Sequence, residues 1–148
     1  MQFPWFSRLV VVAAAVTVSV TAIAADKLYT GTPLRALLVT GGCCHNYAFQ
    51  AGKLTNAVSA QSDVVWTVVN EGGNGTKGQI QLYEGADWAK PFDVVVHNEC
   101  FADTADAAYI RKITAAHRAG KPAVVIHCAM HTYRAAASEQ LTIWAARS

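Results

Sequence analysis

The sequence predicts an α/β protein with a flavodoxin-like, three-layer fold, in which helices cover both faces of a parallel sheet. Four short runs of aliphatic and β-branched residues recur along the chain, and helical or glycine-rich segments separate them. The runs lack the alternation of apolar and polar residues that half-exposed strands show, which is typical of strands buried on both faces. The order strand, helix, strand, loop, strand, helix, strand favours a parallel sheet.

The first half of the chain supplies two strands, a helix and a loop. A strand over residues 35–40 ends at Gly41 and Gly42, which let the backbone turn tightly. A second β-branched run, residues 64–69, predicts another strand, and residues 71–78 are rich enough in glycine to predict a loop. Between the strands, four apolar residues have the spacing of one helix face: Tyr47, Ala51, Leu54 and Val58.

The second half supplies two more strands with a helix between them. These strands are predicted over residues 92–97 and 123–126. Asp103 or Thr104 can cap the helix at its start, and Gly120 ends it. Its inner face is predicted from three residues: Tyr109, Ile113 and Ala116.

Residues 1–24 have the pattern of a secretory signal peptide. Arg8 precedes a long apolar segment, and Ala22 and Ala24 have the spacing of a signal-peptidase site. We therefore expect residues 25–148 to form one exported domain, periplasmic or secreted. The alternative is an uncleaved membrane anchor, although the apolar segment falls short of the roughly 20 residues that a span needs.

The charge balance argues against nucleic acid as a partner. Without the leader the chain has eleven basic residues, since Arg8 is lost from the twelve, against ten acidic residues. Such a near balance provides no strong field for nucleic acid or an anionic membrane. Contact with a membrane is therefore expected only through an uncleaved leader.

Reactive side chains follow the first, third and fourth predicted strands. All four cysteines and four of the five histidines lie in residues 41–47, 97–100 and 127–131. Because the carboxyl ends of parallel strands meet at one edge of a sheet, we expect these residues to gather there. Ligands of open α/β sheets bind at that edge.

Three kinds of chemistry are open to this cluster, and the first is a metal site, with zinc as the candidate cofactor. Histidine, cysteine and carboxylate groups are zinc ligands. Neither a C-x₂-C nor an H-E-x-x-H spacing occurs in the chain. Three or four ligands could come from a cysteine or Glu99 together with the histidines His45, His97, His127 and His131.

The second possibility is a cysteine nucleophile, and the third is a polar binding site. Cys128 is the best-placed nucleophile, but its neighbours include no glycine and no histidine follows His131. In a binding site the same segments would orient a sugar or a carboxylate by hydrogen bonds. The residues suited to this are His45, Asn46, Asn98, Glu99, Tyr133 and Arg134.

The cysteines also have structural interpretations. An exported protein meets an oxidising compartment, so a disulfide is possible among Cys43, Cys44, Cys100 and Cys128. Adjacent Cα atoms are ~3.8 Å apart, below the usual disulfide range of ~4.4–6.8 Å. We therefore expect a bond from Cys43 or Cys44 to Cys100 or Cys128 to be easier than one between the neighbours. A simple packing role is the alternative, and it is also the expected role of His117.

Three segments, residues 37–47, 93–103 and 122–134, resemble the trehalose-utilisation (ThuA-like) family. The resemblance implies the class I glutamine amidotransferase-like fold, a flavodoxin-like parallel sheet. It also implies a role in carbohydrate metabolism, often in exported proteins, with a sugar or an oxidised sugar as the small-molecule substrate of a hydrolase. In amidotransferases the fourth strand ends in the nucleophilic cysteine, whereas here His127 stands at that position. The resemblance therefore argues against glutamine hydrolysis.

These arguments together predict roles for named residues. His127 and His45 are the expected acid–base or ligand residues, and Glu99 is expected to support catalysis by orienting the substrate or the imidazoles. Ligand-binding residues are expected to be Gly42, Asn46, His97, Asn98, His131, Tyr133 and Arg134.

The family resemblance ends near Ala136, and members of the family usually continue for roughly another hundred residues, a size typical of such domains. We therefore expect a chain truncated at its carboxyl end, with the sheet incomplete on one side. Two non-enzymatic alternatives remain: a carbohydrate-binding or scaffolding domain, and a degenerate fragment without activity.

Overall fold

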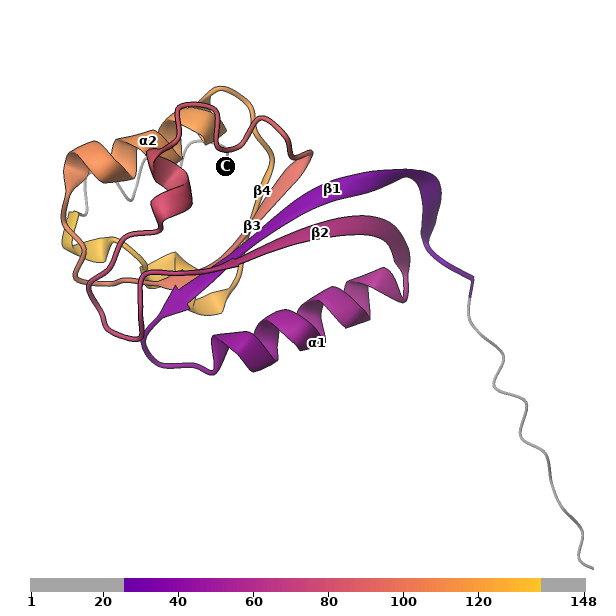
Figure 1. The fold of residues 1–148 in the computed structure, drawn as a ribbon, viewed down its shortest axis with the longest axis horizontal. Helices are drawn as coiled ribbons and strands as arrows, with labels where there is room; N and C mark the ends of the chain where they lie inside the picture. Colours follow the sequence, from indigo (N-terminus) through magenta and orange to yellow (C-terminus); the bar gives the residue numbers. More distant parts are fainter. Residues whose placement is uncertain (1–25, 137–148) are drawn as a thin grey trace, which may run out of the picture.

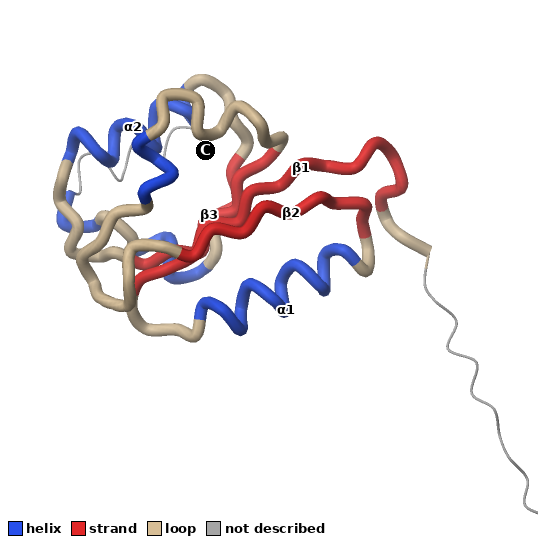
Figure 2. The backbone as a smooth tube through the Cα atoms, viewed as in Figure 1, coloured by secondary structure: helices blue, strands red, loops and turns tan. Residues whose placement is uncertain are grey.

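The computed structural model describes residues 26–136, which form a four-stranded parallel sheet with helices on both faces (Figures 1 and 2). The strand order is β2-β1-β3-β4, and every neighbouring pair is parallel. The strands are β1 (Tyr29–Gly42), β2 (Ser62–Asn70), β3 (Val94–Cys100) and β4 (Ala123–Val125). The helices are α1 (Tyr47–Ser59), α2 (Ala107–Arg118) and the short 3-10 turns η1 (Gln81–Glu84), η2 (His127–His131) and η3 (Arg134–Ala136). The predicted flavodoxin-like fold class is confirmed.

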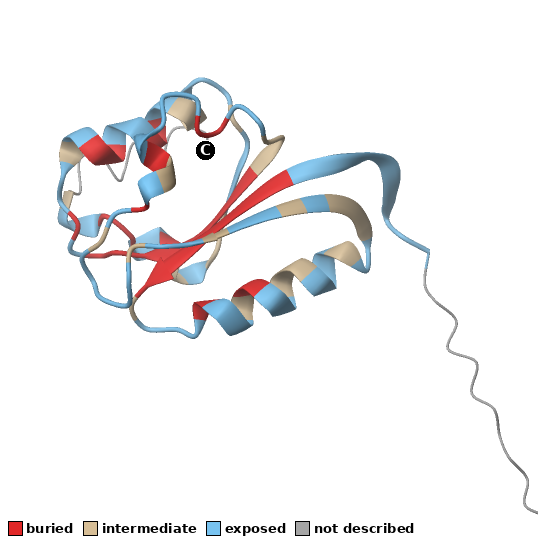
Figure 3. Cartoon of the chain, viewed as in Figure 1, coloured by how far each residue is buried: buried red, intermediate tan, exposed pale blue. Residues whose placement is uncertain are grey.

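Helix α1 lies against one face of the sheet, and α2 with η1 lies against the other (Figure 1). Successive side chains of a strand point to opposite faces, so β1 contributes side chains to the cores on both faces. Leu38 packs with Ala51 under α1, whereas Leu37 and Val39 pack in the larger core under α2. Burial is concentrated in the middle of the sheet (Figure 3).

Several predicted boundaries are corrected. Strand β1 begins at Tyr29, six residues before the predicted start, and so includes Pro33. Strand β3 begins at Val94 and continues to Cys100, three residues beyond the predicted end. It continues because β1 offers backbone partners as far as Gly42, which is in register with Cys100.

Helix α2 begins later than predicted because a different residue caps it. The carboxylate of Asp106 accepts from the backbone N–H groups of Ala108 and Tyr109, at 3.0 and 3.1 Å. The Thr104 hydroxyl is occupied elsewhere, since it bonds the backbone of Gly78. The predicted helix end is confirmed, because Gly120 follows the helix with a φ of +102°.

The predicted leader, residues 1–24, and the tail that follows the family resemblance, residues 138–148, lie outside the described residues. Within residues 26–136, no helix combines the length and the apolar character needed to cross a bilayer.

Candidate functional site

The loop between β1 and α1 is held by two glycines that approach neighbouring backbone closely. Gly41 has a φ of +141° and Gly42 a φ of +95°. A Cβ on Gly41 would lie 2.1 Å from the carbonyl oxygen of Glu71, and one on Gly42 would lie 2.2 Å from that of Cys100. Neither contact is possible for a residue with a side chain, so Gly42 shapes the site through its backbone.

Asn46 ends this loop as the N-cap of α1. Its side-chain oxygen accepts from the backbone N–H of Phe49 at 3.0 Å, which satisfies one of the free donors at the helix start. The predicted ligand residue thus has a structural task. It also sets where the preceding residue, His45, leaves the loop.

His45, His127 and Cys128 form an accessible cluster at the carboxyl edge of the sheet. His45 Nε2 lies 2.9 Å from Cys128 Sγ, and the rings of His45 and His127 meet edge-on with centroids 5.7 Å apart. One donor atom from each residue falls within 4.8 Å of the others. Both histidines are exposed and Cys128 is half-buried, so a ligand can reach all three.

The end of β4 has an unusual backbone that aims this cluster. The ladder continues to Ile126, whose N–H donates to the carbonyl oxygen of His97 at 2.9 Å. The next residue, His127, has a φ of +35° and opens η2. The left-handed backbone conformation costs a non-glycine residue roughly 1–2 kcal/mol of conformational energy. The sharp turn carries His127 and Cys128 out of the sheet toward His45.

His97 and Glu99 lie inside the protein, on the α2 side of β3, and not past the strand end as predicted. His97 Nδ1 is 2.9 Å from Glu99 Oε1, and Tyr83 Oη donates to the same oxygen at 3.1 Å. His97 Nε2 is 2.9 Å from His117 Nε2. These polar side chains can be buried in the core because each finds a hydrogen-bond partner among the others.

The chain of hydrogen bonds fixes where its protons lie. His117 Nδ1 is 2.8 Å from the carbonyl oxygen of Lys121, which can only accept, so that nitrogen carries a proton. Burial lowers the pKa of His117, which keeps the ring neutral near pH 7 and leaves Nε2 to accept from His97. A further proton must separate His97 Nδ1 from Glu99 Oε1, since two lone pairs 2.9 Å apart repel. His97, Glu99 and Tyr83 therefore form one hydrogen-bonded group in the core.

Two buried oxygens beside this pair have no hydrogen-bond partner among the described residues: Glu99 Oε2 and the hydroxyl of Tyr133. Burial, followed by the charge of Glu99, raises the pKa of Tyr133 well above its ordinary value. Tyr133 thus packs in the core as a neutral phenol and does not face the accessible edge, where it was expected to bind a ligand.

The remaining predicted ligand residues separate from the cluster. Asn98 points to the opposite face from Glu99 and donates to Gln50 of α1 at 3.1 Å. Arg134 and His131 are exposed. His131 does not join His127 because η2 is a 3-10 turn, in which residues four apart do not share a face.

Two members of the buried network, His117 and Tyr83, were missed by the sequence argument. His117 was expected only to pack, whereas it is half-buried and its ring lies within hydrogen-bond distance of His97. The spacing held a usable signal, because Tyr109, Ile113 and His117 recur every four residues and share one helix face. Tyr83 had no comparable signal, because it belongs to a short turn whose place depends on the whole fold.

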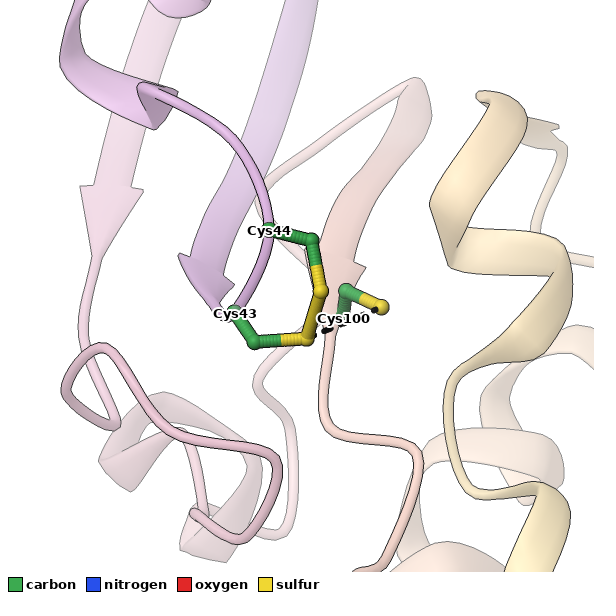
Figure 4. Close-up of side chains that lie close together, drawn as sticks. All are labelled: Cys43, Cys44 and Cys100. Atoms are coloured by element: carbon green, nitrogen blue, oxygen red, sulfur yellow. Dashed lines mark hydrogen bonds between the residues drawn. A yellow bond between two sulfur atoms is a disulfide. The ribbon is translucent and has the colours of Figure 1, made fainter.

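The sulfur atoms form a second group at this edge (Figure 4). A disulfide joins the neighbours Cys43 and Cys44, with Cα atoms 3.7 Å apart, in place of the expected pairing with Cys100 or Cys128. Cys100 and Cys128 are free thiols. Cys100 Sγ lies 3.9 Å from Cys43 Sγ, as the dashed line in Figure 4 marks.

The edge therefore offers a thiol beside an imidazole, a second imidazole, and a disulfide with a neighbouring free thiol. A thiol with a histidine partner can act as a nucleophile, and the same donor types can bind zinc. Behind them lies the buried His97–Glu99 pair, which no ligand reaches directly. No protein-family model, curated protein or solved structure matches this chain.

Proposed function

We propose that the chain is an exported, ThuA-like protein with hydrolase-type activity on a sugar or a sugar derivative. The observation that carries the proposal is the 2.9 Å contact between His45 Nε2 and Cys128 Sγ, with His127 beside them at an accessible sheet edge. The resemblance of residues 37–47, 93–103 and 122–134 supplies the substrate class.

In this proposal Cys128 is the nucleophile and His45 its base. His45 Nε2 takes the thiol proton, the thiolate attacks the electrophilic carbon of the ligand, and the imidazolium returns the proton to the leaving group. Water then releases the product in a second displacement. His127 lies close enough to both residues to bind the ligand or to exchange a proton with it.

The same cluster also suits zinc-assisted hydrolysis. The donor atoms of His45, His127 and Cys128 are near enough to share one ion. Three protein ligands leave a fourth position for water, the arrangement of catalytic zinc sites. Metal analysis of the purified protein distinguishes this chemistry from a metal-free thiol mechanism.

Glu99 takes a different role from the one expected for it. Its carboxylate is fully buried and bonded to His97 and Tyr83. In β3, His97 supports the β4 end through its carbonyl oxygen, which accepts from Ile126 directly before His127. We therefore place the Glu99 and His97 side chains in the core behind the site, outside its chemistry.

The first prediction tests the cluster against a matched control. Substitutions His45→Ala, His127→Ala and Cys128→Ser remove donor atoms from exposed or half-buried positions. They should lower hydrolysis of a panel of nitrophenyl glycosides and sugar esters at least tenfold, with little change in melting temperature. His131→Ala, an exposed histidine of the same turn outside the cluster, should retain activity.

Rates and sugar binding would be measured on the same preparations, by absorbance and by calorimetry. Full activity of His127→Ala or Cys128→Ser would contradict the proposal. Sugar binding without turnover in the unaltered protein would favour the non-catalytic binding domain instead.

A further inference from the structure

Three sulfur atoms meet where β1 and β3 end side by side. Cys43 and Cys44 share a disulfide, and the thiol of Cys100 lies 3.9 Å from Cys43 Sγ (Figure 4). A sulfur in a disulfide carries no proton, so Cys100 is the only possible donor in that contact. The arrangement places a thiol directly against one sulfur of a disulfide, which is the starting geometry for thiol–disulfide exchange.

We propose that Cys43, Cys44 and Cys100 form an internal thiol–disulfide exchange site. The Cys100 thiolate attacks Cys43 Sγ, so the Cys43–Cys100 bond forms while the Cys43–Cys44 bond breaks. The electron pair of the broken bond leaves on Cys44 Sγ, which takes up the proton that Cys100 lost. The step is an isomerisation, so it needs no external oxidant or reductant.

The backbone already suits the product disulfide. Gly42 is in register with Cys100 across the β1–β3 pair, and the N–H of Cys43 donates to the carbonyl oxygen of Cys100 at 3.1 Å. Neighbouring strands lie ~4.8 Å apart, which is the spacing of Gly42 and Cys100. Cys43 is the next residue and bonds the backbone of Cys100 directly, which places the two cysteines on adjacent backbone segments, as a disulfide with Cα atoms ~4.4–6.8 Å apart requires. The Cys43–Cys44 pair, with Cα atoms 3.7 Å apart, lies outside that range.

Exchange would release Cys44 from a strained backbone and expose a reactive thiol. Cys44 is already exposed and has a φ of +84°, a left-handed conformation that few residues with side chains adopt. It directly precedes His45, which contacts Cys128. The two disulfide forms would thus differ in an accessible thiol and in the constraint on the loop that carries His45.

The surroundings of Cys100 predict how exchange depends on pH. Burial raises the pKa of its thiol, the neighbouring Cys128 raises it further, and Tyr47 and Arg134 lower it. The reactive thiolate is therefore scarce near pH 7. The exchange rate should therefore rise with pH above pH 7, as the thiolate fraction does.

The second prediction is tested by trapping Cys44 in the full chain, purified without reductant. Native protein at pH 8 is treated with excess N-ethylmaleimide, denatured in acid and digested without reduction. Trypsin cleaves after Arg35 and Lys53, so a Cys43–Cys44 disulfide stays within one peptide, whereas Cys43–Cys100 links two. We expect maleimide on Cys44 within a linked pair of peptides, formed at a rate independent of reagent concentration.

Variants separate Cys100 from the other free thiol. Cys100→Ser and Cys100→Ala should abolish labelling of Cys44, whereas Cys128→Ala should preserve it and speed it, because one of the influences that raise the pKa of Cys100 is gone. Absence of linked peptides in the unaltered protein, or labelling of Cys44 unchanged in folded Cys100 variants, would overturn the proposal. If the Cys100 variants fail to fold, a rate of labelling in the unaltered chain that does not change with pH would overturn it.

This inference does not rest on the proposed hydrolase function. Its readout is which sulfurs are joined, measured without any ligand. Failure of the sugar assays therefore leaves it standing, and failure of the trapping experiment leaves the proposed hydrolase untouched.

Discussion

At the scale of single residues, the protein places its histidines in two contrasting environments. His45 and His127 are exposed at the sheet edge, whereas His97 of β3 and His117 of α2 bond each other between the strand and the helix. The exposed pair can exchange protons with a ligand. The buried pair is committed to internal partners, and its proton positions follow from the carbonyl oxygen of Lys121.

The third prediction concerns the pH dependence that His117 contributes. Burial lowers its pKa in the folded state below the ordinary 6.5, so the unfolded chain binds the extra proton more readily. Its contribution to stability is present above about pH 6.5 and is lost as the pH falls through that value toward the folded pKa. Urea unfolding at pH 7.5, 6 and 5 would measure this, with His117→Gln as the comparison.

The unaltered protein should lose more stability between pH 7.5 and pH 5 than His117→Gln does, because glutamine does not titrate. Three titratable groups face His117, namely His97, Glu99 and Lys121, so the difference between the two proteins reports His117 together with its effect on these neighbours. Parallel pH profiles for the two proteins would mean that the His117 pKa is the same folded and unfolded.

At the scale of elements, caps and turns determine where each helix and strand places its residues. The carboxylate of Asp106 starts α2 by accepting two backbone hydrogen bonds, and the bond from Tyr109 lowers its pKa most. The same helix carries Tyr109 and His117 into the core. Moving the helix start would therefore disturb the buried network as well.

The fourth prediction separates the observed cap of α2 from the one that the sequence suggested. Asp106→Ala removes the acceptor for two N–H groups and should lower the melting temperature by a few degrees. Asp103→Ala should leave it nearly unchanged, because Asp103 uses its backbone N–H, toward Thr76, and that group survives the substitution. Calorimetry of both variants would measure the melting temperatures. A larger decrease for Asp103→Ala than for Asp106→Ala would indicate that Asp103, as first expected, caps the helix.

At the scale of the whole molecule, the sheet was predictable because its signals are local and repeated. Apolar runs identified the four strands, and their carboxyl ends correctly placed His45, His127 and the cysteines near one edge. The contact between His45 and Cys128 was not predictable, since it depends on the positive φ of His127 and on two separate loops. The Cys43–Cys44 bond was disfavoured for the same reason: typical Cα distances do not describe an unusual turn.

The burial of Glu99 shows a further limit of the sequence argument. A polar residue after an apolar run suggests a strand end, yet β3 pairs with β1 as far as Cys100, and the hydrogen bonds among His97, Tyr83 and Glu99 allow its polar side chains to be buried. The hydrogen bonds that make this burial possible involve partners distant in the chain. They can be recognised only once η1 and β3 are placed together.

The fifth prediction is that residues 25–148 unfold in one cooperative transition. Leu37, Leu38 and Val39 in β1 are fully buried and contribute to cores on both faces of the sheet. Because one strand serves both cores, loss of either should remove the packing of the other, which is the condition for two-state behaviour. Far-UV circular dichroism and tryptophan fluorescence should report the same midpoint on heating. Two separate midpoints would show that the α1 and α2 layers melt independently, and a melt without any transition would show that the packing of β1 does not stabilise this segment by itself.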